Sequence, residues 1–250
     1  MKVIIGGSTS MVGTEIIRQA LSHPDVTSVV GIGRRVIQPP PDLGPKADPS
    51  KFKSVALKDF ENYPEDVKRE LYDADAVIWT IGVNPAKLRS MTWEEACKVS
   101  RDFAVAAIKT IGPLPREGKT APLRFICMSG EHAERDQTKR PFLMADYCLM
   151  RGDAENQILA YAANSNGTVE ALISKAGVIQ DPESSLFRKT GHLLIQAISR
   201  LGKIHVPVIA ACLLDQALHG FEKDTLRNDD LNRIGHKALA KYGRGVAEKK

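Results

Sequence analysis

An apolar run that breaks into glycines and restarts as a helix is the feature that most restricts how this chain can fold. Residues 3–5 are Val-Ile-Ile, segment 6–13 is Gly-Gly-Ser-Thr-Ser-Met-Val-Gly, and residues 14–21 have helical apolar spacing. Such a turn places the free N–H groups of a helix start beside small residues, where a pyrophosphate can approach the backbone. We therefore predict a phosphate-binding turn directly after the first strand.

The glycine pattern of this turn is incomplete. Dinucleotide-binding turns with a three-residue rhythm carry three glycines, and here the three positions hold Gly7, Ser10 and Gly13. The pattern G-x-G-x-x-G is not met either. The turn is therefore compatible with nucleotide binding and with an ordinary tight strand-to-helix connection, and the rest of the chain has to distinguish them.

Length and composition restrict the class of protein. A chain of 250 residues, 43% of them hydrophobic, can bury a substantial core. The net charge of +5 is spread along the sequence, which disfavours nucleic-acid binding, and no apolar run is long enough to span a bilayer. We expect a cytoplasmic protein with no targeting segment, with reduced thiols and with no metal site, because ligand spacings are absent. The widely spaced cysteines are Cys97, Cys127, Cys148 and Cys212.

Strand-like and helix-like segments alternate along most of the chain. This alternation predicts an α/β fold, a Rossmann-type doubly wound parallel sheet flanked by helices. We expect one domain over 1–250, with elements of a small substrate cap at about 178–221 and a polar tail at 222–250. Strands are predicted over 3–5, 26–31, 52–57, 76–81, 124–128 and 169–174, and helices over 14–21, 67–72, 92–111, 145–163, 191–201 and 210–221.

Two arginines follow the second predicted strand. Arg34 and Arg35 come directly after Gly33, and no acidic residue occurs before Asp42. In a doubly wound fold this strand end lies beside the adenosine ribose, where an acidic residue holds the 2′-hydroxyl and arginine accommodates a 2′-phosphate. The pair favours NADP(H) as the cofactor; the alternative is two solvated loop arginines.

Three residues at later strand ends complete the predicted cofactor site. Asp59 follows the third strand and could accept a hydrogen bond from the adenine, or belong to a surface turn. Thr80 and Gly82 follow the fourth strand, where glycine lets the backbone pass close to a cofactor or simply ends the strand. The cofactor-binding residues predicted from these segments are Gly7, Ser8, Thr9, Ser10, Met11, Val12, Gly13, Arg34, Arg35, Asp59, Thr80 and Gly82.

A serine, a tyrosine and an arginine form a candidate reaction centre. Ser129 ends the fifth strand, and Tyr147 and Arg151 lie four residues apart on one face of the next helix. A phenol titrates near pH 10, and we expect the guanidinium to lower the pKa of Tyr147 so that it can act as an acid or base. Ser129 would polarise a substrate carbonyl. His132 is either a further acid–base group or an exposed loop residue.

With these residues in view, the chain resembles an atypical short-chain dehydrogenase/reductase of the Tat-interacting-protein-like group. It looks most similar to fungal oxidoreductase-like proteins of aromatic-polyketide gene clusters. The resemblance implies NADP(H) binding and a Ser/Tyr/Lys catalytic set, with Ser129 and Tyr147 in the first two roles. It also implies cofactor contacts by Tyr147, Arg151, Gly177 and Val178. The resemblance covers about residues 1–220, and its runs lie at 6–13, 32–35, 99–103, 128–130, 133–136, 146–152, 175–178 and 206–208.

Three positions depart from the family pattern. Ser10 replaces the middle glycine, Arg151 stands where the family has lysine, and Lys175 stands where many relatives have arginine. Arginine keeps the positive charge but does not release its proton, so it can assist Tyr147 electrostatically and is a poor proton relay. These departures weaken the assignment of redox chemistry more than the assignment of the fold.

The sequence favours an NADP(H)-dependent oxidoreductase that reduces a carbonyl or quinone-like group of a small aromatic metabolite, as in polyketide tailoring of secondary metabolism. A non-redox isomerase, dehydratase or ring-opening enzyme using Tyr147 and His132 is one alternative, and a non-catalytic NADP(H)-sensing protein is another. The oligomeric state, monomer or homodimer, stays open. Residues that would line an aromatic pocket, or else pack in the core, are Met91, Phe142, Met144, Met150 and Phe187.

Overall fold

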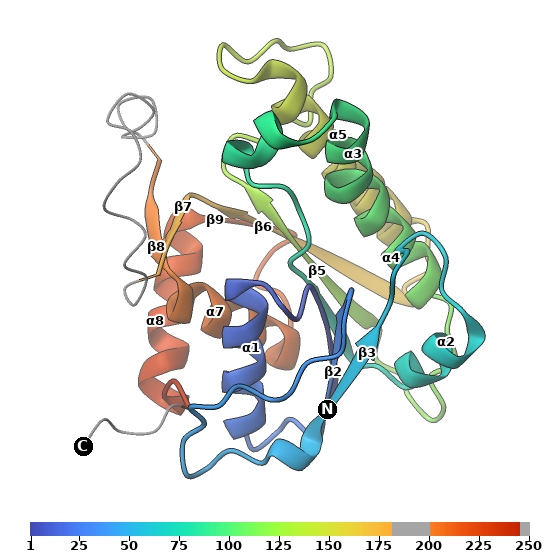
Figure 1. Cartoon of the computed structure of the whole chain (residues 1–250), viewed down its shortest axis with the longest axis vertical. Helices are drawn as coiled ribbons and strands as arrows, with labels where there is room; N and C mark the ends of the chain where they lie inside the picture. Colours follow the sequence, from blue (N-terminus) through green and yellow to red (C-terminus); the bar gives the residue numbers. More distant parts are fainter. Residues whose placement is uncertain (182–200, 246–250) are drawn as a thin grey trace.

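A seven-stranded sheet of order β3-β2-β1-β4-β5-β6-β9 forms the centre of the protein (Figure 1). The computed structural model describes residues 1–181 and 201–245. Every neighbouring pair of strands in this sheet is parallel, which confirms the predicted doubly wound α/β class. The strands are β1 (Lys2–Gly6), β2 (Ser28–Gly33), β3 (Phe52–Ala56), β4 (Ala76–Trp79), β5 (Leu123–Gly130), β6 (Val169–Ala176) and β9 (Thr225–Arg227).

Helices cover both faces of the sheet (Figure 1). Successive strand residues point to opposite faces, so Val3 and Ile5 pack against one layer and Ile4 against the other. One layer contains α1 (Met11–Ser22), α7 (Val206–His219) and α8 (Asn228–Tyr242). The other contains α2 (Glu65–Leu71), α3 (Trp93–Cys97), α4 (Phe103–Ile111) and α5 (Ala145–Ala163).

The order of the strands places the first turn at the centre of one sheet edge. β1 pairs with β2 on one side and with β4 on the other, so the winding direction reverses at β1. In open α/β sheets, ligands bind at the carboxyl ends of the strands beside such a reversal. The turn between β1 and α1 therefore lies where a ligand is expected.

One predicted helix is not regular. The segment expected as a single helix over 92–111 consists of α3, a π-helical segment at Lys98–Asp102, and α4. A π-helical turn holds one residue more than the α-helical path, and such turns are frequent at functional sites. Apolar spacing does not reveal it, because both flanking helices keep their buried faces.

The C-terminal part of the chain departs from the prediction. The expected polar tail at 222–250 contributes strand β9 and helix α8 to the main fold, and the predicted cap helix is α7, which packs on the sheet. A small separate parallel sheet joins β7 (Val178–Gln180) to β8 (Lys203–His205). The helix predicted at 191–201 lies almost entirely outside the described residues.

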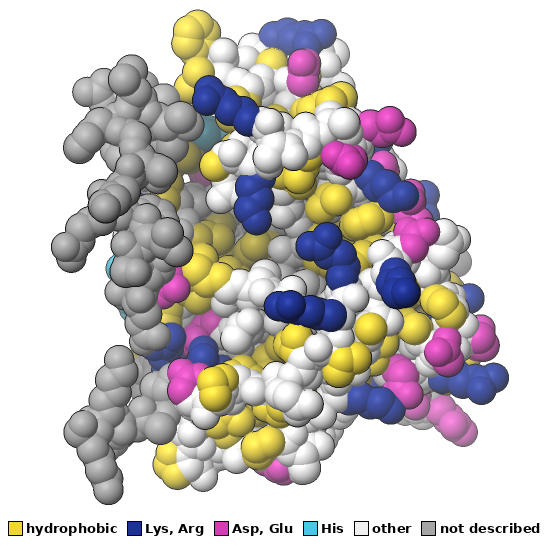
Figure 2. All heavy atoms as spheres, viewed as in Figure 1, with side chains coloured by type: hydrophobic (Ala, Val, Ile, Leu, Met, Phe, Trp, Pro, Cys, Tyr) yellow, Lys and Arg dark blue, Asp and Glu magenta, His cyan; other side chains and the backbone are white. Residues whose placement is uncertain are grey.

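All four cysteines are free. Within residues 1–181 and 201–245, no helix has the length and hydropathy to cross a membrane, and no three potential metal ligands cluster. On the face seen in Figure 2, Lys and Arg side chains are interspersed with acidic ones and do not gather in one stripe.

The buried face of α8 provides a test of whether the residues after 222 belong to the main fold. We expect Leu231→Ala to lower the free energy of unfolding by about 2–5 kcal/mol, because Leu231 is fully buried and its loss leaves a cavity. The control Lys237→Ala, on the exposed face of the same helix, should change it by less than about 0.5 kcal/mol. Chemical denaturation followed by circular dichroism measures both. Equally small effects would show that this segment is a dispensable tail.

Candidate functional site

The turn between β1 and α1 is built around two glycines. Gly7 has a φ of +88°, a conformation that side chains disfavour. A Cβ at Gly13 would lie 2.3 Å from the carbonyl oxygen of Gly7. The N–H groups of Gly7 and Ser8 both donate to the carbonyl of Ile32, at 3.0 and 3.1 Å, which ties the turn to the end of β2. The first and third glycines are therefore required by packing.

Ser10 takes the place of the middle glycine and is used inside the turn. Its hydroxyl is the N-cap of α1 and accepts from the Gly13 N–H at 2.9 Å. The same oxygen lies 2.9 Å from the Thr80 hydroxyl, which in turn donates to the Gly6 carbonyl at 2.9 Å. Thr80 thus connects β4 to the turn, and the serine is compatible with the fold of a phosphate-binding turn.

The residues around this turn fit a dinucleotide. The start of α1 leaves the N–H groups of Met11 and Val12 without intrahelical acceptors, and the buried hydroxyl of Ser8 makes no hydrogen bond in the structure. Arg34 and Arg35 are exposed at the end of β2. Neither arginine makes a hydrogen bond or ion pair within the described part of the chain. These groups, with Thr9, would hold the phosphates and ribose of such a cofactor.

Asp59 and the Gly177–Val178 pair already have partners. Asp59 accepts from Asn62 at 2.6 Å and from the Glu61 N–H at 3.1 Å, and these bonds lower the pKa of its carboxyl. The N–H groups of Gly177 and Val178 donate to Asn228 and to the Gly202 carbonyl. The structure therefore gives all three a role within the fold, and their predicted cofactor contacts stay predictions.

Tyr147 and Arg151 both reach the segment that follows β4. The Tyr147 hydroxyl donates to the Val83 carbonyl at 2.7 Å. Arg151 is buried and donates to the carbonyls of Ser100 and Met128, each at 2.7 Å. A Cβ at Gly82 would lie 3.2 Å from its guanidinium, so this glycine makes room for the arginine. The helix face predicted from their spacing is present.

The pKa of Tyr147 moves in the direction opposite to the prediction. Burial raises it above the usual value, and this effect outweighs the lowering by the positive charge of Arg151. The guanidinium of Arg151 donates to two carbonyls that hold it in place. Among the described residues, no hydrogen bond joins it to the phenol of Tyr147. Tyr147 is therefore a protonated phenol at neutral pH, the form that carries a proton to donate.

Ser100 was not predicted as a functional residue. Its hydroxyl accepts from the Val83 N–H at 2.9 Å while its carbonyl accepts from Arg151. Ser100 and Tyr147 thereby fix both backbone polar groups of Val83. The residue lies in the π-helical segment, and only its place in the run 99–103 pointed to it.

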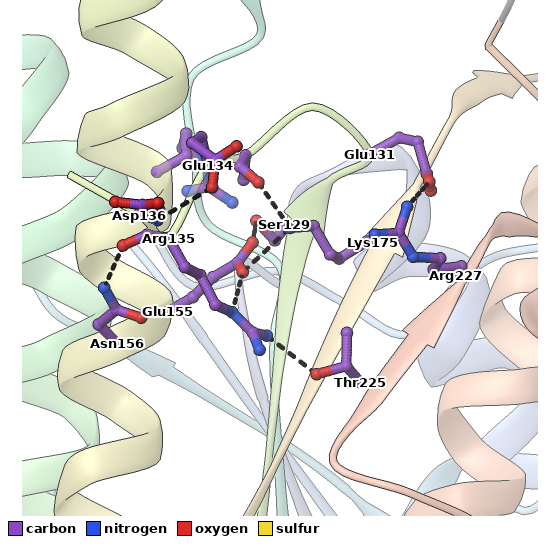
Figure 3. A network of polar contacts seen from close by, with 12 residues as sticks. Ser129, Glu131, Glu134, Arg135, Asp136, Glu155, Asn156, Lys175, Thr225 and Arg227 are labelled. Carbon is purple, nitrogen blue, oxygen red and sulfur yellow. Dashed lines mark hydrogen bonds and ion pairs between the residues drawn. The ribbon is translucent and has the colours of Figure 1, made fainter. Parts of the chain in front are cut away.

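Ser129, at the end of β5, belongs to a second group of residues (Figure 3). Its hydroxyl donates to Glu155 at 2.5 Å, and this buried carboxylate also accepts from Arg135 at 2.7 Å and from Lys175 at 3.2 Å. In the described structure no hydrogen bond joins Ser129 to Tyr147. Sequence reasoning missed Glu155, since a single glutamate inside a helix has no local pattern.

A pocket of about 830 Å³ opens next to this second group. Residues of the β5–α5 loop form one wall, and Lys175 and Arg227 from β6 and β9 form another. His132 lines the pocket and is exposed, whereas Ser129 and Tyr147 are not among the lining residues. Of the predicted aromatic-pocket residues, Phe142 lines it, and Phe187 lies outside the described residues.

No protein-family model matches the sequence, and no curated protein matches it. Solved structures do share the fold. A UDP-glucuronic acid 4-epimerase from Bacillus cereus, in complex with UDP-glucuronic acid and NAD, matches with a TM-score of 0.62 at 15% identity, over 91% of this chain and 77% of that one. MoeE5, in complex with UDP-glucose and NAD, matches with a TM-score of 0.65 at 12% identity, over 99% and 84%.

A third solved structure is of nearly equal length. The oxidoreductase ylbE from Lactococcus lactis matches with a TM-score of 0.59 at 18% identity, over 97% of this chain and 98% of that one. The chain has a Rossmann-type fold. It shares that fold with structures described as an epimerase and an oxidoreductase, two of these three neighbours being complexes with NAD. At identities this low, the structural matches establish the fold and do not identify the substrate.

The buried carboxylate of Glu155 gives a prediction for stability. We expect Glu155→Gln to lower the free energy of unfolding by about 3–5 kcal/mol, because it leaves Arg135 and Lys175 without their shared counter-charge. As a control, Asp146→Asn breaks an exposed pair with Arg140 and should cost less than about 1 kcal/mol. Urea denaturation measures both variants. Equal losses would contradict a central role for the buried carboxylate.

Proposed function

We propose that this protein is an NADP(H)-dependent oxidoreductase that reduces a carbonyl or quinone-like group of a small aromatic metabolite. The observation that carries the proposal is the arginine pair beside a glycine turn that β2 itself holds in place: Arg34 and Arg35 are exposed and have no partner among the described residues. Two of the structural neighbours were solved with NAD. The arginine pair supports the phosphorylated cofactor here, because it can bind a 2′-phosphate.

The bound nicotinamide would supply the hydride. Tyr147 would donate its proton to the substrate oxygen, which requires its hydroxyl to leave the Val83 carbonyl. Its raised pKa keeps it in the acid form needed for reduction. Arg151, held by two carbonyls, stabilises the phenolate left behind and takes no proton itself.

The aromatic nature of the substrate is supported by the pocket beside the Ser129–Glu155 group. Phe142, on the pocket wall, is fully exposed, and Leu143 next to it is half exposed. Apolar side chains left open to water beside a cavity are typical of ligand-binding surfaces. Membership of the atypical short-chain dehydrogenase/reductase group and a place in polyketide tailoring remain part of the proposal.

The cofactor assignment predicts a selective loss of affinity. In the double variant Arg34→Ala/Arg35→Ala, NADPH should bind about tenfold to a hundredfold more weakly, since charge-assisted hydrogen bonds to the 2′-phosphate are lost. NADH affinity should change little. Isothermal titration calorimetry measures both, with Lys109→Ala on α4 as an exposed control. A parallel loss for both cofactors would refute the role in phosphate recognition.

The catalytic assignment predicts a loss of turnover without a loss of cofactor. We expect Tyr147→Phe to reduce the rate of NADPH-dependent naphthoquinone reduction by about a hundredfold or more, because the proton donor is removed. NADPH affinity should remain within about twofold of the wild type, which separates catalysis from binding. Full turnover by the variant would be incompatible with Tyr147 as the proton donor.

A second candidate function is NADP(H) binding without hydride transfer. One observation favours it: the Ser129 proton is engaged by Glu155 and is not directed toward a carbonyl beside Tyr147. A sensor of the redox state must bind NADP+ and NADPH with different affinities. Calorimetry with both forms tests this candidate, and equal affinities would exclude it.

A further inference from the structure

The pocket beside Ser129 has an unusual charge arrangement. Five cationic residues and two carboxylates line it. The cations at its rim are individually neutralised: Arg227 pairs with Glu131 at 2.7 Å, and Arg140 pairs with Asp146 at 3.2 Å. Lys139 also has acidic partners. The remaining two cations differ from these.

Arg135 and Lys175 share one carboxylate, that of Glu155. All three come from different elements, the β5–α5 loop, β6 and α5, and they meet in one network (Figure 3), of which Arg135 and Lys175 line the pocket. Lys175 is 6% exposed and Glu155 is 1% exposed. Burial limits screening by water, and within 4 Å these two cations face a single carboxylate, so this three-residue cluster carries one more positive than negative charge.

Both cations also retain hydrogen-bond donors. Lys175 donates to Glu155 and to the Ala133 carbonyl at 2.6 Å, which uses two of its three protons. Arg135 donates through Nε to Glu155 and through one Nη to Thr225 at 2.9 Å. Its other Nη has no hydrogen-bond partner within residues 1–181 and 201–245. The pocket therefore offers unused charged donors.

Part of the pocket lining is apolar. Pro141, Phe142 and Leu143 line it, and Phe142 is 100% exposed. Directly after them, Met144 adopts a left-handed conformation with a φ of 53°, which turns the chain into α5.

We propose that this pocket binds a small aromatic carboxylate, with the carboxylate on Arg135 and Lys175 and the ring against Phe142 and Leu143. One anionic group matches the excess positive charge of the Arg135–Lys175–Glu155 cluster, and the planar guanidinium fits a carboxylate geometrically. Glu155 is a positioning residue that holds the two cations. The inference rests on the proposed function, since it names the substrate class for the same enzyme.

Benzoylformate, its uncharged methyl ester and phenyl phosphate serve as probes, in calorimetric titrations without dinucleotide. We expect benzoylformate to bind, and Lys175→Met to weaken its binding by at least about tenfold, since a charged donor is lost. Arg135→Gln should act in the same direction and serves if the first variant does not fold. The ester should bind more weakly than the acid and be indifferent to either substitution.

Lys119→Met is the matched control. Lys119, like Lys175, donates to a carboxylate, that of Asp75 at 2.6 Å, and to a backbone carbonyl, that of Asp73 at 2.5 Å. It does not line the pocket, so its loss should leave benzoylformate binding within about twofold of the wild type. Melting temperatures of all variants monitor folding.

Three outcomes would overturn the inference: equal binding of acid and ester, unchanged benzoylformate affinity in both pocket variants, and tighter binding of phenyl phosphate than of benzoylformate. NADPH titrations on the same samples separate this proposal from the proposed function. NADPH binding with no benzoylformate binding refutes the substrate class alone. Benzoylformate binding with no NADPH binding refutes the cofactor assignment alone and leaves the carboxylate site standing.

Discussion

The position of β1 between two parallel neighbours is the constraint on which the rest of the structure depends. Its apolar residues are fully buried because helices cover both faces of the sheet. The chain winds outward from β1 in both directions, so the ends of β1, β2 and β4 meet at one edge. The turn held by the Ile32 carbonyl and the Thr80 hydroxyl lies at that edge. Everything proposed about a cofactor follows from this arrangement.

The sheet edge beyond β4 divides into two separate polar groups. On one side, Tyr147 and Arg151 are bonded to backbone carbonyls around Val83 and Ser100. On the other, Ser129 is bonded to the buried carboxylate of Glu155. Serine and tyrosine of the expected catalytic set thus belong to different hydrogen-bond networks. A substrate oxygen that accepted a hydrogen bond from both hydroxyls would require each of them to leave its present acceptor, because a hydroxyl has one proton to donate.

Sequence patterns predicted the elements whose formation depends on residues close together in the sequence. The helix over 145–163 agrees with the bounds of α5, and the turn at 6–13 lies where the pattern placed it. Contacts between residues far apart in the sequence could not be predicted. The hydroxyl of Ser129 donates to Glu155 and the hydroxyls of Ser10 and Thr80 are hydrogen-bonded, but neither segment alone has a pattern that indicates its partner. The polar sequence after 222 hid β9 and α8, because a short edge strand and an amphipathic surface helix are polar on average.

The π-helical segment at Lys98–Asp102 makes the structure sensitive to deletions at this point of the chain. A π turn amounts to one residue inserted into an α-helix, and each residue rotates a helix by about 100°. Deleting any one residue here would restore regular winding and turn α3 out of phase with α4. The carbonyl and hydroxyl of Ser100 would then no longer meet Arg151 and Val83. A one-residue deletion in this segment would therefore disturb both contacts of Ser100 at once.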